Sequence, residues 1–262
     1  MFTINPFSEL SELISPIAMQ VYVVTMVLLV VGGTLLDTIH KKSAQYFFKN
    51  AEKARKDASK SLSGGEKASI TIKTVAEDVL TSAEFCNPRR RVAHLLTMYG
   101  FIIFAATTAI MIFGYMGSTT PAILPLLWHA GALMLCVGGY WFWFFIRVDV
   151  AAEGNPWYRV VRADLFILSL LATATFALIW SALQAAGVAG WTSLFFGLFI
   201  LASTVLFGGV VWSKFAHMFF KPAAAYQKRV AEADGSRDGL PEPADQPEQF
   251  GPGIKRLAPR NY

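Results

Sequence analysis

The residues of this chain that could bind a metal cofactor are its histidines, and there are four of them: His40, His94, His129 and His217. His94 follows three arginines at the start of one long apolar run, and His217 follows the end of another, so two antiparallel helices would place them at the same depth. Two imidazoles that face each other at one level of a helical bundle can hold a b-type haem, whose propionates favour basic neighbours. Such neighbours are present: Arg89, Arg90, Arg91 and Lys214. The spacing is consistent with one haem between His94 and His217.

Each histidine also has a simpler interpretation. His40 ends the first apolar run at nearly the same level, so it competes for either ligand position. His94 and His217 lie near helix ends, where histidines also cap carbonyl groups or contact lipid phosphates. His129 comes eight residues after Pro121, which places it about 12 Å into the apolar layer at the helical rise. No other histidine shares that depth, so His129 is a candidate for a proton-handling or quinone-contacting residue, or for a plain helix-to-helix hydrogen bond.

The histidines lie in or next to long stretches that carry no charged residue, so the structure of these stretches must position them. Hydrophobic residues make up 54% of the 262 residues and charged residues only 16%, whereas a soluble domain carries roughly a quarter. A helix needs about 20 apolar residues to cross the hydrocarbon layer, and the last apolar run is long enough for a hairpin broken near Gly187. We therefore predict an all-α integral membrane protein, a bundle of five transmembrane helices. The expected helices cover residues 16–39, 92–116, 121–147, 164–186 and 190–216.

The basic residues predict the orientation of this bundle. All 23 lysines and arginines lie in residues 41–91, in residues 147–162 or from residue 214 onward. By the positive-inside rule these segments are cytoplasmic, so the N-terminus is expected outside and the C-terminus in the cytoplasm. The outer segment 1–15 carries two glutamates and no basic residue, unlike a cleavable signal. The net charge of +5 then reflects topology and anionic lipid, and we expect no nucleic-acid partner.

Two segments on the basic side are large enough to bind a partner. Within the membrane domain, expected over residues 16–226, the loop 41–91 should continue the first helix, turn at residues 63–65 and form a second helix over residues 74–85. The tail 227–262 is rich in proline and glycine and has too little apolar surface to fold alone. Its last part combines aromatic and basic residues, and we expect it to dock on a partner. Those residues are Phe250, Lys255, Arg256, Arg260 and Tyr262.

Two sequence elements resemble a known family. Segment 85–101 (FCNPRRRVAHLLTMYGF) and segment 212–222 (WSKFAHMFFKP) are similar to the membrane domain of the quinone-interacting membrane-bound oxidoreductase complex of sulfur metabolism. That domain belongs with the five-helix, nitrate-reductase gamma-like cytochrome b subunits. Within this group the chain, over about residues 16–226, resembles most closely the membrane anchor subunit associated with dissimilatory adenylylsulfate reductase.

The resemblance implies a non-catalytic anchor and electron-transfer subunit in a bacterial cytoplasmic (inner) membrane. It would link the flavoprotein and iron–sulfur subunits of a cytoplasmic adenylylsulfate reductase to membrane quinone. His94 and His217 match the histidines that hold the cytoplasm-proximal haem of the group, whereas the distal haem has no matching histidine near Phe104 or Ile200. The resemblance therefore implies at most one haem b. Two alternatives remain open, a haem-free scaffold for the soluble enzyme and a small transporter.

Overall fold

The computed structural model describes most of the chain and is all-helical over the part it describes. That part comprises residues 2–40, 43–83, 85, 87–148, 154–213, 215 and 217–236, without the side chains of residues 43–46, 50 and 217. Five of its helices are long and apolar enough to cross a membrane, which confirms the predicted fold class. They are α1 (Pro16–His40), α4 (Pro88–Gly114), α5 (Ile123–Trp141) with its continuation η3 (Phe142–Ile146), α6 (Leu165–Ala185) after the short η4 (Arg162–Asp164), and α7 (Ala189–Gly208).

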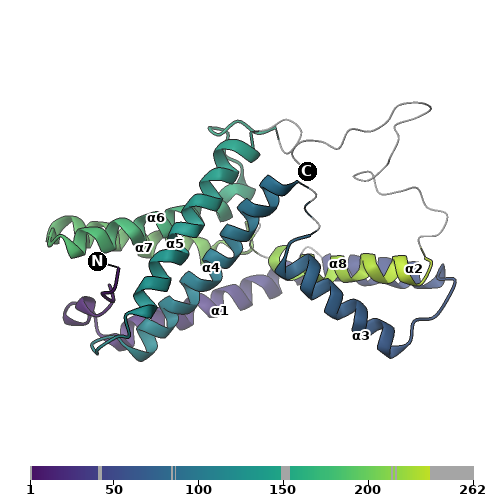
Figure 1. The fold of residues 1–262 in the computed structure, drawn as a ribbon, viewed down its shortest axis with the longest axis horizontal. Coiled ribbons are helices and arrows are strands. Elements are labelled where there is room, and N and C mark those ends of the chain that lie inside the picture. Colours follow the sequence, from purple (N-terminus) through teal and green to yellow (C-terminus); the bar gives the residue numbers. More distant parts are fainter. Residues whose placement is uncertain are drawn as a thin grey trace.

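The bundle has two different ends. In Figure 1, α6 and α7 form one hairpin that contacts α1, and the α4–α5 hairpin crosses this group obliquely. The N-terminal segment and the α4–α5 and α6–α7 turns gather at one end, which we call the N-terminal end. Hydrogen bonds connect them: Asn5 donates to Thr120 at 2.9 Å and Gln184 donates to the carbonyl of Pro6 at 3.0 Å. The remaining helices lie at the other end, the basic end.

Glycines allow α4 and α5 to pack closely. A Cβ on Gly131 of α5 would lie 2.8 Å from the amide nitrogen of Phe104, and a Cβ on Gly100 of α4 would lie 2.8 Å from the carbonyl oxygen of Gly131. Contacts this short leave no room for any side chain. Small residues at such crossings let two apolar helices gain van der Waals contact within lipid, where the hydrophobic effect does not bring them together. The two glycines therefore make this the tightest-packed crossing we describe.

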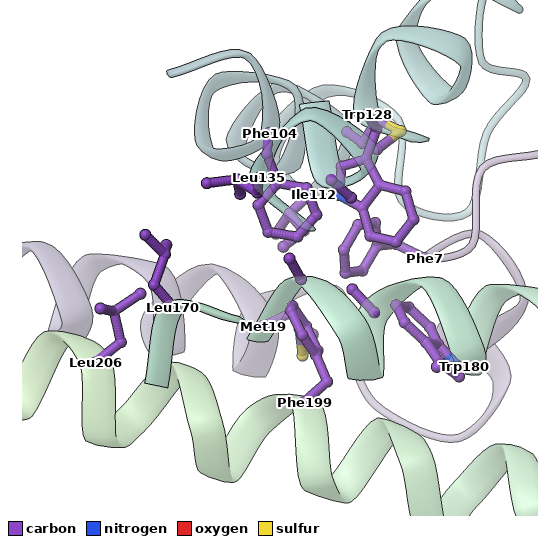
Figure 2. Packing of buried hydrophobic residues seen from close by; sticks show 14 of the residues in the cluster. Phe7, Met19, Phe104, Ile112, Trp128, Leu135, Leu170, Trp180, Phe199 and Leu206 are labelled. Carbon is purple, nitrogen blue, oxygen red and sulfur yellow. The ribbon is translucent and has the colours of Figure 1, made fainter. Parts of the chain in front are cut away.

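Aromatic rings fill the centre of the N-terminal end. Phe7, from the segment before α1, is 0% exposed and lies edge-on to Trp128 and Trp180, with ring centroids 5.9 and 5.2 Å apart. Figure 2 shows this group above Phe199 of α7. Trp128 is fully buried and its indole donates to Thr108 at 2.8 Å. The N-terminal segment, with its short helix η1 (Glu9–Glu12), thus caps the bundle.

A compact group of helices forms the basic end, and we call it the platform. It consists of α2 (Ser43–Lys56), α3 (Gly64–Lys73), η2 (Thr74–Leu80) and α8 (His217–Ala233). Arg229 of α8 donates to Asp78 at 2.6 and 3.0 Å and to Glu77 at 2.8 Å, and its hydrogen bonds with Asp78 raise the pKa of the guanidinium further above its usual range. This network holds α8 against η2. Residues 227–233, the start of the expected tail, therefore belong to helix α8.

Other boundaries differ from the expected ones for local reasons. The expected turn at residues 63–65 comes earlier in the chain, because Ser63 already caps the start of α3. The Ser63 hydroxyl accepts from the amide of Glu66 at 3.3 Å, and the Glu66 carboxylate accepts from the amide of Ser63 at 2.7 Å. These bonds lower the pKa of Glu66. α4 begins at Pro88 because the side chain of Asn87 caps it and proline suits a first turn. The fifth span ends at Gly208 and not at residue 216.

Candidate cofactor and partner sites

His94 lies in the second turn of α4 at the basic end and is held by the segment that follows η2. Its Nδ1 lies 3.0 Å from the hydroxyl of Ser82, and its ring centroid lies 4.9 Å from that of Phe85. Ser82 is 1% exposed and has a φ of +50°, a left-handed conformation that is uncommon for a residue other than glycine. The surrounding structure must impose that conformation, so the position of the Ser82 hydroxyl is well determined.

Two further hydrogen bonds fix this segment across the side of α4. The Nε of Arg91 donates to the carbonyl of Thr81 at 2.7 Å, and the hydroxyl of Tyr99 donates to the carbonyl of Leu80 at 2.7 Å. Both donors are on α4 and both acceptors are in the two residues before Ser82. The imidazole of His94 is therefore oriented by its own helix and by the chain that crosses it.

The expected basic neighbours of His94 have separate roles. The guanidinium carbon of Arg90 lies 5.3 Å and the Nζ of Lys221 lies 5.8 Å from the centroid of the Phe85 ring, so two cations flank one aromatic ring. Arg91 binds a backbone carbonyl, as described above, and Arg89 is exposed. Lys214 lies outside the described residues. These side chains thus connect α4, the segment before it and α8.

The fit of a haem to these residues can be judged only from His94. A haem-ligating histidine uses one ring nitrogen for iron and donates the other N–H to a neighbour, and a donation from Nδ1 to Ser82 would leave His94 oriented in that way. His217 begins α8 at the same end, but its side chain lies outside the described part. An apolar cavity of about 330 Å³ is lined by Phe101 of α4 and Met218 of α8 at this end, but His94 does not line it. Among the described residues no group of three or more metal-binding side chains gathers.

The two other histidines do not join this site. His40 ends α1 and is exposed. His129 of α5 is 1% exposed; its Nδ1 lies 2.7 Å from the carbonyl of Pro125 and its Nε2 lies 2.8 Å from the hydroxyl of Ser181 on α6. Because a carbonyl only accepts, Nδ1 carries the proton and Nε2 accepts from Ser181. Of the interpretations that the sequence left open for His129, the helix-to-helix hydrogen bond is the one present in the structure.

A buried ion pair organises the loop between α5 and α6, and sequence reasoning missed it. The side chain of Arg147 is 0% exposed and donates to Asp164 at 2.5 Å. It also donates to the carbonyls of Asn155, Pro156 and Arg159 at 3.2, 3.0 and 2.7 Å. Asp164 is only 7% exposed. The one available signal was an isolated arginine at the end of an apolar run, followed by an aspartate before the next run.

The remaining expected contacts could not be placed. The docking residues of the tail, from Phe250 to Tyr262, lie outside the described residues. Comparison of the chain with models of protein families, with curated proteins and with solved structures found no match.

Proposed function

We propose that this chain is the membrane anchor and electron-transfer subunit that links a cytoplasmic adenylylsulfate reductase to the quinone pool of a bacterial cytoplasmic membrane. The observation that carries the proposal is the platform, a folded group of helices joined to one end of a five-span domain. The positive-inside rule makes that end cytoplasmic. A transporter would not need such a platform, and a soluble redox enzyme would find there a rigid, basic surface on which to dock.

Charges on the platform support the docking of a large soluble partner. Helix α2 places Lys53, Arg55 and Lys56 in its last turn, and all three are exposed. The Arg229 network fixes α8 beside η2, so part of this surface is preorganised and loses little conformational freedom on binding. Basic surfaces of this kind accelerate encounter with an acidic partner and lose affinity as salt is added.

Electron transfer to quinone requires two electrons from the soluble enzyme and two protons from water. His94, with His217, would hold one b-type haem at the cytoplasmic end, and that group would supply a one-electron relay. Independently of a haem, Ser82 fixes the orientation of the His94 imidazole, and Phe85 packs against the ring. The chain thus contributes an oriented imidazole at the end of the bundle where the soluble enzyme docks.

A haem-free scaffold is the second candidate, and one observation favours it. His94 already contacts Ser82 and Phe85, as a purely structural histidine would. The two candidates agree on docking and differ only in the electron relay. Changing His94 to alanine would then leave the assembly of the complex intact.

One experiment tests both parts. The full chain, co-expressed with adenylylsulfate reductase where haem supply is sufficient, is purified and its reduced-minus-oxidised spectrum and haem content are measured. The proposal expects co-purification that weakens with salt, together with one b-type haem per chain that is lost in His94→Ala but kept in the control His40→Ala. Co-purification without haem would support the scaffold. Absence of any association with the reductase, at low salt as well, would overturn both candidates.

A further inference from the structure

An apolar cavity separates α1 from α4, α6 and α7, and the function proposed above does not use it. Its volume is about 330 Å³, within the roughly 300–1,000 Å³ that is usual for ligand sites. Its lining on α1 runs from Met19 to Val31, a length of about 18 Å at the helical rise. Since one leaflet is half of a hydrocarbon core about 30 Å thick, the cavity is long enough for one lipid chain.

The cavity opens sideways along the stretch of α1 between Tyr22 and Gly33, two residues that hold this helix against the bundle. Towards the N-terminal end, the hydroxyl of Tyr22 on α1 lies 3.0 Å from that of Thr204 on α7. Towards the basic end, Gly33 of α1 packs on Val210 so closely that a Cβ would come within 2.9 Å of the valine. Between these contacts Val27 lines the cavity and is nevertheless 56% exposed. One side of the cavity therefore meets the surroundings of the bundle, which in a membrane are lipid chains.

The walls of the cavity suit a hydrocarbon chain and not a polar headgroup. The hydroxyls of Ser203 and Thr173 donate within their own helices at 2.8 and 2.7 Å. Thr108 donates to the carbonyl of Phe104 at 2.7 Å and accepts from Trp128 at 2.8 Å. No described residue that lines the cavity has a buried side-chain polar atom without a partner. Apolar cavities of this kind stay dry, and a hydrocarbon chain would supply the missing dispersion contacts.

Positive charge gathers where such a chain would leave the cavity at the basic end. Met218 and Phe219, at the start of α8, line the cavity there, and Phe219 is 49% exposed. Lys221 follows within one turn of α8 and is exposed. It flanks the Phe85 ring together with Arg90, as described above. An anionic headgroup would complement these two cations.

We propose that this cavity binds one acyl chain of an anionic phospholipid, whose phosphate lies beside Lys221 and Arg90. The lipid completes the packing of α1, because it fills the space that the side chains of α4 and α7 leave open. A quinone also has an apolar chain, but it is neutral and has no negative charge to place beside Lys221 and Arg90. The cavity walls also offer no hydrogen-bonding group to the quinone ring. The inference does not rest on the proposed redox function.

The test compares two phospholipid headgroups and two alanine-to-phenylalanine substitutions in α4. The full chain is purified in a mild detergent, its bound lipids are extracted and quantified by mass spectrometry, and its melting temperature is measured with added phosphatidylglycerol or phosphatidylcholine of identical chains. Ala109→Phe places a ring in the cavity, whereas the control Ala106→Phe adds the same ring on the exposed face of α4. Lys221→Gln removes one cation.

We expect phosphatidylglycerol to raise the melting temperature more than phosphatidylcholine in the wild type and in the Ala106→Phe control. Bound phosphatidylglycerol should be largely lost in Ala109→Phe, because the ring occupies space that the acyl chain would fill and removes its dispersion contacts. Lys221→Gln should reduce the difference between headgroups without abolishing it, because Arg90 remains beside the phosphate. Ala109→Phe should itself be as stable as the control without added lipid, because it fills a void. Equal lipid content and equal responses in both phenylalanine variants, or quinone in place of phospholipid, would overturn the proposal.

Discussion

The buried pair of Arg147 and Asp164 provides the sharpest test of how the basic end is held together. Arg147→Met removes the charge and the donors, so the Asp164 carboxylate keeps only the amide of Val161, at 2.8 Å, and three loop carbonyls lose their donor. Breaking a buried ion pair from one side costs about 3–5 kcal/mol. Asp164→Asn keeps the shape and leaves Arg147 its carbonyl acceptors, but it leaves a fully buried guanidinium that cannot be neutralised, so we expect a similar cost, about 3–5 kcal/mol.

These costs convert into measurable melting temperatures. At roughly 2–4 °C per kcal/mol for a chain of this size, Arg147→Met should melt about 10 °C below the wild type. The assay follows the folded peak in detergent after heating. Arg162→Met is the matched control, because Arg162 is exposed in the same loop.

The double variant separates charge from shape. Replacing Arg147 and Asp164 together by Met and Asn removes both charges, so it should cost less than the sum of the two single changes. If Arg147→Met melts within about 1 °C of Arg162→Met, a difference of well under 1 kcal/mol, the pair does not stabilise the loop and our account of the basic end is wrong.

Three further changes test other parts of the structure. Gly131→Val should destabilise the α4–α5 crossing by about 3 kcal/mol, whereas Gly197→Val should be tolerated, because a Cβ at that position would meet no atom within 4 Å; melting in detergent compares the two. Arg229→Gln should loosen α8 by about 1–2 kcal/mol and speed its amide hydrogen exchange, and Lys228→Gln, an exposed neighbour, should not. His129→Phe should cost about 1–3 kcal/mol, because it leaves buried hydrogen-bonding groups without a partner, yet should not change quinone reduction if this histidine is structural.

The five membrane helices could be predicted from the sequence because their signal is local. A run without charge that is long enough to cross a bilayer has few alternatives, since a lipid-exposed backbone must satisfy its own hydrogen bonds. The start of α4 could have been placed better, because Asn87 before Pro88 is a recognisable helix start. Ser63 and Glu66 form a capping box, which is equally visible in the sequence.

The candidate site was less predictable because its contacts join segments far apart in the chain. Nothing local to His94 indicates that Ser82, in a left-handed conformation, would hold its Nδ1. Nothing local to Asp164 indicates that it pairs with Arg147, 17 positions earlier in the chain. His129 gave several interpretations because the sequence does not say which residue of α6 faces it. Which polar side chains meet inside the bundle depends on how each helix is rotated about its own axis. A run that is apolar on every side has little periodicity, so its sequence does not specify that rotation.

The cap formed by Phe7 constrains the order in which the protein can be assembled. Residues before α1 are made first, yet their binding site includes Trp128 on α5 and Trp180 on α6, and Gln184 bonds Pro6 across 178 positions of sequence. The N-terminal segment must therefore wait, undocked, until three more spans have been inserted. Closure of the cap is then a late step of biogenesis, and a bulky group fused just ahead of this segment would delay the completion of the bundle without affecting insertion of the first span.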